Sequence, residues 1–263
     1  MFQELINSFV FPAPRFPEGD WNPPDLGQHD AWFASADGTR LHGWFLAARQ
    51  PRATILYAHG NGEHVAWQAD LLRFYRDELN CSVFAWDYRG YGRSEGTPHE
   101  SGILQDAAAA LNWLSQHTDQ KTESLIVAGR SLGGAVAIHL ASEQPVAGLV
   151  VESAFTSAPE VAAVHYPFLP VRQLMRTQLR AIDWIARYQG PLLMSHAVDD
   201  EIVPYAMGES LFAGCPSRDK EFFRIDSGGH NHPPPIEYYR RLATWLSDHA
   251  AGRVARNLFR VGP

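Results

Sequence analysis

Short apolar runs alternate with amphipathic runs along most of the 263-residue chain. The apolar runs are rich in strand formers: ATILYAH, CSVFAWD, SLIVAGR, VAGLVVES, PLLMSHAV and EFFRIDS. Between and after them lie segments whose apolar residues follow helical spacing: WQADLLRFYRDEL, GILQDAAAALNWLSQH, SLGGAVAIHLASE, AMGESLF and IEYYRRLATWLSDHA. Continuous apolar strands that alternate with helices are typical of an α/β fold. They predict a mainly parallel central sheet with helices on both faces.

Three parts of the chain depart from this alternation. HDAWFASA and RLHGWFLAA, joined at Asp37–Gly38, predict an antiparallel N-terminal hairpin at the edge of the sheet. The proline-rich residues 1–27 predict an irregular arm, because proline fixes φ and lacks an N–H donor. Residues 155–190 show no strand pattern and are long for a connection, so we expect a small helical cap inserted there. We predict one domain over residues 1–263, with 251–263 as a tail.

Composition narrows the class of protein. Hydrophobic residues make up 45% of the chain and charged residues 19%, which is typical of a globular protein with a substantial core. The net charge of -7 argues against a nucleic-acid partner. Cys81 and Cys215 lack metal-site spacing, and Cys81 lies in an apolar strand, so a buried free thiol is favoured over a disulfide.

Membrane and export signals are weak. No apolar run reaches the ~18–20 residues of a membrane span. The opening MFQELINSFVFPAPR has neither the basic region nor the small-residue cleavage site of a signal peptide. We therefore expect a cytoplasmic protein whose N-terminal arm packs on its own domain rather than touching a membrane.

Two segments satisfy Gly-x-Ser-x-Gly, a pattern that places a nucleophilic serine on a tight strand-to-helix turn. They are GRSEG at Gly92–Gly96 and GRSLG at Gly129–Gly133. Ser131 directly follows a predicted strand and opens a predicted helix, whose N-terminal N–H groups favour developing negative charge. Ser94 lies in a glycine-rich loop, and the following Glu95 would repel an oxyanion. Ser131 is therefore the predicted nucleophile, and Ser94 a loop residue.

A serine nucleophile needs a histidine base and a carboxylate that orients the base, in the order Ser, acid, His in this kind of fold. PLLMSHAVDDEIVP places Asp199 and Asp200 just after a late strand. Asp200 is favoured as the acid, with Asp199 stabilising the turn. Glu152, which also ends a strand, is a weaker alternative.

The base and the oxyanion donors are expected in two glycine-rich loops. In EFFRIDSGGHNHPP, His230 follows the last strand, and His232 is the alternative. HGNGEH supplies the loop after an early strand, and the N–H groups of Asn61 and Leu132 are the predicted oxyanion donors. His59 is expected to hold that loop. The HNH run lacks a third ligand, so no metal site is predicted.

Six segments together resemble serine hydrolases of the α/β-hydrolase fold: HGNGE, DYRGYGRSEG, GRSLGG, ESAFTS, DDEIVP and GGHNH. The likeness is strongest to the branch of membrane-associated depalmitoylating hydrolases and their bacterial relatives. It implies Ser131 as nucleophile, Asp200 as acid, His230 as base, and backbone donors at Asn61 and Leu132. It also makes DYRGYGRSEG a structural loop.

Two departures from the family pattern qualify the likeness. Ala197 stands where relatives often carry glycine, and no cysteine precedes Cys81, which argues against a lipidated N-terminus and against protein depalmitoylation. The expected reaction is hydrolysis of a small-molecule carboxylic ester, with thioesters as an extension, and it requires no cofactor. Four cap residues are expected either to line an apolar acyl pocket or to pack beneath the cap: Phe155, Tyr166, Phe168 and Leu169.

The same residues leave other functions open. An amidase, a peptidase or a perhydrolase can use the same three side chains, and a binding protein can use the same frame without catalysis. The natural substrate and the oligomeric state are not predicted.

Overall fold

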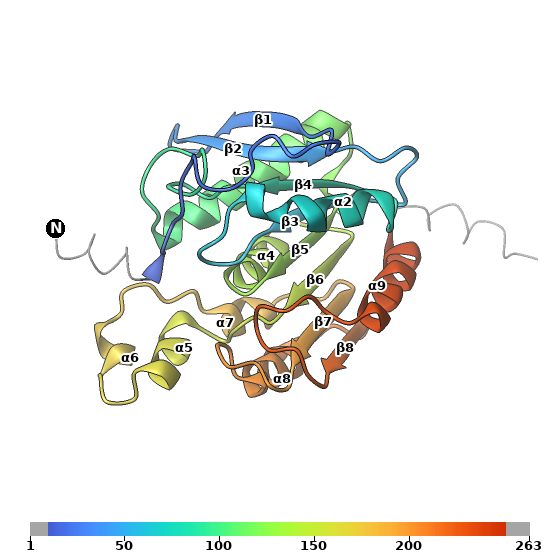
Figure 1. Ribbon diagram of the computed structural model, residues 1–263. Coiled ribbons are helices and arrows are strands. Elements are labelled where there is room, and N and C mark those ends of the chain that lie inside the picture. Colours follow the sequence, from blue (N-terminus) through green and yellow to red (C-terminus); the bar gives the residue numbers. More distant parts are fainter. Residues whose placement is uncertain (1–9, 251–263) are drawn as a thin grey trace, which may run out of the picture.

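The computed structural model describes residues 10–250, so the start of the predicted arm and the tail at 251–263 lie outside the described residues. Its eight strands form one sheet in the order β1-β2-β4-β3-β5-β6-β7-β8 (Figure 1). The strands are β1 (His29–Ala34), β2 (Arg40–Leu46), β3 (Ala53–Ala58), β4 (Cys81–Trp86), β5 (Ile126–Arg130), β6 (Gly148–Glu152), β7 (Leu192–Ala197) and β8 (Lys220–Ile225). β1 and β2 pair antiparallel with each other, and β2 pairs antiparallel with β4. The other six strands, β3 to β8, pair only in parallel with one another, which confirms the predicted mixed sheet.

The predicted helices follow the strands in the expected order. The longer ones are α2 (Ala69–Asp77), α3 (Glu100–Thr118), α4 (Leu132–Glu143), α8 (Tyr205–Gly214) and α9 (Ile236–His249). Short 3-10 turns occur at Val65–Gln68 and Thr122–Ser124. In the predicted cap region the chain forms three short helices and no strand: α5 (Ala158–His165), α6 (Val171–Leu174) and α7 (Ala181–Ile185).

Two hydrophobic clusters, one on each face of the sheet, explain the continuous apolar strands. In β3, Leu56 and Ala58 belong to the cluster under α3, α4, α7 and α8, whereas Ile55 and Tyr57 belong to the cluster under α2 and α9. Successive side chains of a strand point to opposite faces, so a strand covered on both faces is apolar at most of its positions. Figure 1 shows α2 and α9 on the near face, with α3 and α4 behind the sheet.

The described part of the arm packs on the domain, with Phe11, Trp21 and Leu26 buried. Cys81 and Cys215 are buried free thiols, as the sequence predicts. None of the helices between residues 10 and 250 combines the length and the apolar character that a membrane crossing requires.

His64 makes stability depend on pH. It is buried between the rings of Trp21 and Trp67, and neither of its ring nitrogens has a hydrogen-bond partner among the described residues. Burial lowers its pKa below the ordinary value of 6.5, so the folded protein holds the neutral ring. A histidine with a depressed pKa contributes stability above its unfolded pKa and loses it as the pH falls. We expect the melting temperature to fall between pH 7.5 and 5.5, and His64→Gln to flatten that slope. The matched change at exposed His232 should leave the slope unaltered.

Candidate active site

The predicted site residues gather at the carboxyl end of the parallel strands. Asn61 follows β3, Ser131 follows β5, Asp200 follows β7 and His230 follows β8. The carboxyl ends of parallel strands share one edge of the sheet, where ligands bind in open α/β folds. Four segments that are distant in the sequence therefore meet at one place.

Ser131, His230 and Asp200 form a continuous hydrogen-bonded chain. The Oγ of Ser131 lies 3.1 Å from Nε2 of His230, and Nδ1 of the same ring lies 2.7 Å from Oδ2 of Asp200. The imidazole is 5% exposed and the side chain of Asp200 is fully buried. This is the arrangement in which a carboxylate orients a base toward a hydroxyl.

A strained turn presents Ser131. Its φ of 54° and ψ of -118° lie outside the regions that non-glycine residues usually adopt. The flanking glycines permit this turn: a Cβ on Gly129 would lie 2.1 Å from the carbonyl oxygen of Gly133, and a Cβ on Gly133 would lie 2.0 Å from that of Ala58. Both glycines of the motif are therefore required by close backbone approach, and Ser131 stands at the N-terminus of α4.

Hydrogen bonds hold the carboxylate of Asp200 ionised. Burial alone would raise its pKa, but donors from His196, His230 and Val203 outweigh burial and lower the pKa below its usual range. The backbone N–H groups of Ile202 and Val203 donate to Oδ1 at 2.9 and 2.7 Å. Nε2 of buried His196 lies 3.2 Å from Oδ2 and 2.8 Å from the carbonyl oxygen of Val203. His196 was not among the residues predicted from the sequence, where its only signal is a histidine near the end of a mostly apolar strand.

The two acidic neighbours of Asp200 hold the loop that carries the base. Asp199 accepts hydrogen bonds from the N–H groups of Gly228, at 3.0 Å, and Gly229, at 2.9 Å. These two bonds lower the pKa of Asp199. Glu201 accepts from the backbone N–H of His230 at 3.1 Å. Asp199 therefore stabilises a turn, and only Asp200 contacts the imidazole.

The alternatives for the acid and the base, Glu152 and His232, make other contacts or face solvent. Glu152 is buried and accepts a hydrogen bond from the hydroxyl of Tyr238 at 2.6 Å. Burial raises its pKa above the ordinary carboxyl value. His232 is exposed, and the ring that lies within hydrogen-bond distance of Ser131 is that of His230. The position of the acid is therefore held by Asp200, and that of the base by His230.

The predicted oxyanion donors are held in place and unpaired. Neither the N–H of Asn61 nor that of Leu132 has a hydrogen-bond acceptor among the described residues. The side chain of Asn61 is fixed at both ends, because its Nδ2 donates to the carbonyl of Val10 at 2.8 Å and its Oδ1 accepts from Tyr91 at 2.7 Å. Nδ1 of buried His59 lies 2.8 Å from the carbonyl oxygen of Gly60, consistent with a role in holding this loop.

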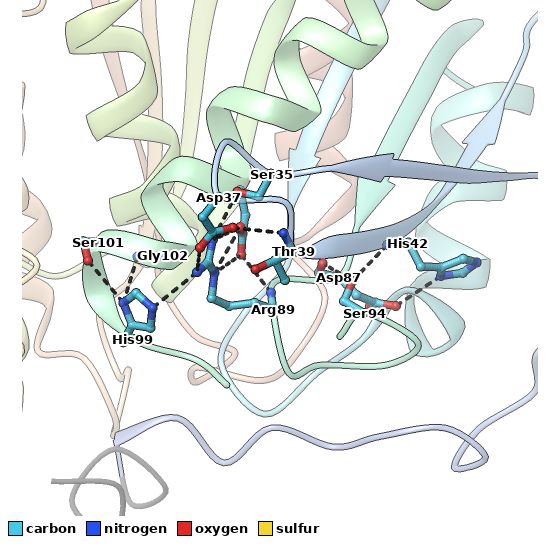
Figure 2. A network of polar contacts seen from close by, with 11 residues as sticks. Ser35, Asp37, Thr39, His42, Asp87, Arg89, Ser94, His99, Ser101 and Gly102 are labelled. Carbon is cyan, nitrogen blue, oxygen red and sulfur yellow. Dashed lines mark hydrogen bonds and ion pairs between the residues drawn. The ribbon is translucent and has the colours of Figure 1, made fainter. Parts of the chain in front are cut away.

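Ser94 belongs to a structural network, shown in Figure 2. Its hydroxyl donates to the carbonyl of Asp87 at 2.6 Å and accepts from the N–H of His42 at 2.9 Å, so it is buried and fully occupied. In the same loop the guanidinium of Arg89 pairs with Asp106 and Asp37, both at 2.7 Å. The second serine motif therefore stabilises the loop that also supplies Tyr91 to Asn61.

Ser94→Ala tests this assignment. The change leaves the buried N–H of His42 and carbonyl of Asp87 without partners, which costs about 1–3 kcal/mol. We expect a lower free energy of unfolding in urea, with kcat unchanged at a temperature where the protein stays folded. A loss of kcat comparable to that of a nucleophile variant would contradict the structural role.

Only one of the four predicted pocket residues is buried. Phe155 is 7% exposed and belongs to the hydrophobic core. Tyr166 is 58% exposed, Leu169 56% and Phe168 98%. These three side chains therefore do not pack beneath the cap, and their role in binding an acyl chain stays a prediction.

Comparisons with known proteins agree with the fold. A family model described as serine aminopeptidase, S33, matches residues 49–170. The alpha/beta hydrolase domain-containing protein WAV2 of Arabidopsis thaliana is 36% identical over 244 residues, which cover 85% of this chain and 75% of WAV2. An uncharacterized protein of Mycobacterium tuberculosis is 38% identical over 210 residues, covering 79% of this chain and 74% of the other.

Solved structures show the same architecture at lower identity. The Pyrococcus furiosus esterase Pf2001 superposes with a TM-score of 0.77 at 20% identity, covering 91% of this chain and 99% of the esterase. The acetyl xylan esterase from Paenibacillus sp. R4 superposes with a TM-score of 0.70 at 15% identity, covering 88% and 86%. Together with the sequence relatives and the strand order, these likenesses show that the chain belongs to the α/β-hydrolase family.

Proposed function

We propose that the protein hydrolyses carboxylic esters through Ser131, His230 and Asp200. One observation carries the proposal: the hydroxyl of Ser131, on a strained turn, lies 3.1 Å from an imidazole whose other nitrogen lies 2.7 Å from a buried carboxylate. A serine hydroxyl is a weak nucleophile at neutral pH, and this contact supplies the base that activates it. Two of the structural neighbours are esterases, which supports an ester substrate.

The geometry leads to a two-step mechanism. His230 takes the proton of Ser131 through Nε2 as Oγ attacks the ester carbonyl, and Asp200 stabilises the imidazolium through Nδ1. The N–H groups of Asn61 and Leu132 bind the oxyanion of the tetrahedral intermediate. The imidazolium then donates its proton to the departing alkoxide, which leaves as the alcohol. Water, deprotonated by His230, attacks the acyl-enzyme and releases the acid and free Ser131.

The cap favours short acyl chains. Tyr166, Phe168 and Leu169 face solvent, so none of them forms an enclosed apolar channel for a long chain. We expect kcat/KM to be higher for p-nitrophenyl acetate and butyrate than for the palmitate, because a long chain gains little burial at this site.

A substrate series tests the proposed function. The panel is a set of p-nitrophenyl esters from acetate to palmitate, an acyl-CoA thioester, and an aminoacyl p-nitroanilide. The anilide tests for aminopeptidase activity, because the matching family is described as serine aminopeptidase. Ester hydrolysis that depends on Ser131 supports the proposal, whereas faster anilide cleavage would favour a peptidase. Rates no higher than spontaneous hydrolysis for every substrate, in the wild type and in Ser131→Ala alike, would favour a non-catalytic binding protein.

A further inference from the structure

Arg130 is the variable residue before the serine in the Gly-x-Ser-x-Gly motif, and its side chain contacts two loops of the site. It is the last residue of β5, directly before Ser131, and its side chain is 21% exposed. The mechanism above leaves this side chain without a role. Its position is fixed by the sheet, because its backbone pairs in register with Glu152 of β6.

The guanidinium binds the loop of the base. Its Nη2 donates to the carbonyl oxygen of His230 at 2.7 Å and to Oδ1 of Asn231 at 3.0 Å. Asp199 and Glu201 accept hydrogen bonds from N–H groups of the same loop. Arg130 complements them, because it donates a hydrogen bond to a carbonyl oxygen of that loop. Hydrogen bonds from an ionised donor are roughly twice as strong as neutral ones.

The same guanidinium also reaches the loop of the predicted oxyanion donor. Its Nη1 lies 3.7 Å from Oε1 of Glu63. The other oxygen of Glu63 accepts from the backbone N–H of Gly60 at 2.9 Å and from Gln68 at 3.1 Å. Gly60 directly precedes Asn61, so Glu63 connects Arg130 to the segment that presents the Asn61 N–H.

We infer that Arg130 is a positioning residue which, with Glu63, sets the imidazole of His230 and the N–H of Asn61 relative to Ser131. The inference rests on the proposed function, because it concerns the same reaction. A planar guanidinium can hold two loops from two nitrogens, whereas the point charge of a lysine can hold only one of them in good geometry. Displacement of a reacting group by about 1 Å can cost about 100-fold in rate.

Steady-state kinetics on p-nitrophenyl acetate tests the inference. Arg130→Met should lower kcat by about 100-fold while KM changes less than about threefold. Arg130→Lys should recover only a small part of the loss. Glu63→Gln, which keeps an acceptor for Gly60 but loses the charge, should cost about tenfold, less than additively with Arg130→Met. The matched control is Arg187→Met, which removes an exposed guanidinium paired with Glu143 far from the site.

Chemical rescue separates positioning from general support of the fold. Millimolar guanidinium chloride should restore part of kcat to Arg130→Ala, while sodium chloride at the same concentration should not. An Arg130→Met variant with wild-type kcat would overturn the inference. So would a loss that appears only as a lower melting temperature, with no guanidinium rescue and no effect of Glu63→Gln. If Arg130→Met does not fold, Arg130→Lys and Glu63→Gln decide the question.

The outcomes also separate this inference from the proposed function. Ester hydrolysis that survives Ser131→Ala would refute the proposed function. If hydrolysis requires Ser131 but kcat is unchanged by substitution of Arg130 or Glu63, only the positioning role is refuted.

Discussion

Ser131→Ala should reduce kcat/KM for p-nitrophenyl acetate by about 10⁴- to 10⁶-fold, the largest effect expected from any single change. The variant keeps the binding surface and the N–H groups of Asn61 and Leu132, but it lacks the oxygen that attacks the carbonyl. Alanine at this position removes only one hydroxyl, so the melting temperature should stay close to that of the wild type. The measurement is the initial rate of p-nitrophenolate release, corrected for spontaneous hydrolysis.

The matched control is Ser94→Ala, the same substitution in the other Gly-x-Ser-x-Gly segment. Both serines carry a hydroxyl within hydrogen-bond distance of a partner, but only Ser131 contacts a histidine ring. A large rate loss in the Ser94 variant and none in the Ser131 variant would reverse the assignment of the nucleophile.

Asp200→Asn should reduce kcat by about 10⁴-fold with little change in KM. The amide is almost the same size as the carboxylate, but it carries no charge to stabilise the imidazolium that forms when His230 accepts the proton. Its NH₂ group can also donate to Nδ1, which favours the wrong tautomer of the ring. The loss of charge further leaves His196 without its ionised neighbour at 3.2 Å. Steady-state kinetics above pH 7 measures the effect.

Asp199→Asn and Glu152→Gln are the controls for the acid. Asparagine at position 199 can still accept the hydrogen bonds of Gly228 and Gly229 through its carbonyl oxygen. Glutamine at position 152 can still accept from Tyr238. Each control should keep kcat within about tenfold of the wild type, since neither group contacts the imidazole. A control that loses more activity than Asp200→Asn would show that the acid is assigned wrongly.

The order of elements was predictable because burial on both faces of a sheet leaves a strong pattern. Every residue of β3 and β4 is buried, and their largely apolar runs, each with one small hydroxyl residue, are visible in the sequence. Ser131 was separable from Ser94 for a similar reason, since only Ser131 stands between a strand and a helix. The glycines at 129 and 133 are explained by distances that no residue with a Cβ would allow.

The choice within DDE could not be made from residue type alone. Asp199, Asp200 and Glu201 are consecutive carboxylates at the end of β7, and all three bind the loop of His230. Which one reaches the imidazole depends on the direction in which the turn points each side chain. That direction is a property of the three-dimensional turn and leaves no trace in the composition.

The contact of His196 and the side-chain directions in the cap escaped prediction because both depend on the three-dimensional course of the chain. His196 lies 3.2 Å from Asp200, four residues later, across the turn that follows β7, and α8 packs against its ring, since a Cβ on Gly208 would come within 2.4 Å of it. In the cap, the apolar character of Phe168 and Leu169 was clear, but hydrophobicity does not say which way a side chain points. No role was predicted for Arg130, because the Gly-x-Ser-x-Gly motif accepts almost any residue before the serine.

Covalent labelling by a fluorophosphonate tests the central claim most directly, because the reagent reacts with a serine that a neighbouring base has activated. The full-length protein is treated, digested and mapped by tandem mass spectrometry. We predict one adduct, on the peptide that carries Ser131, and its loss in His230→Ala. An unlabelled Ser131 in active protein, or an adduct on Ser94, would contradict the account.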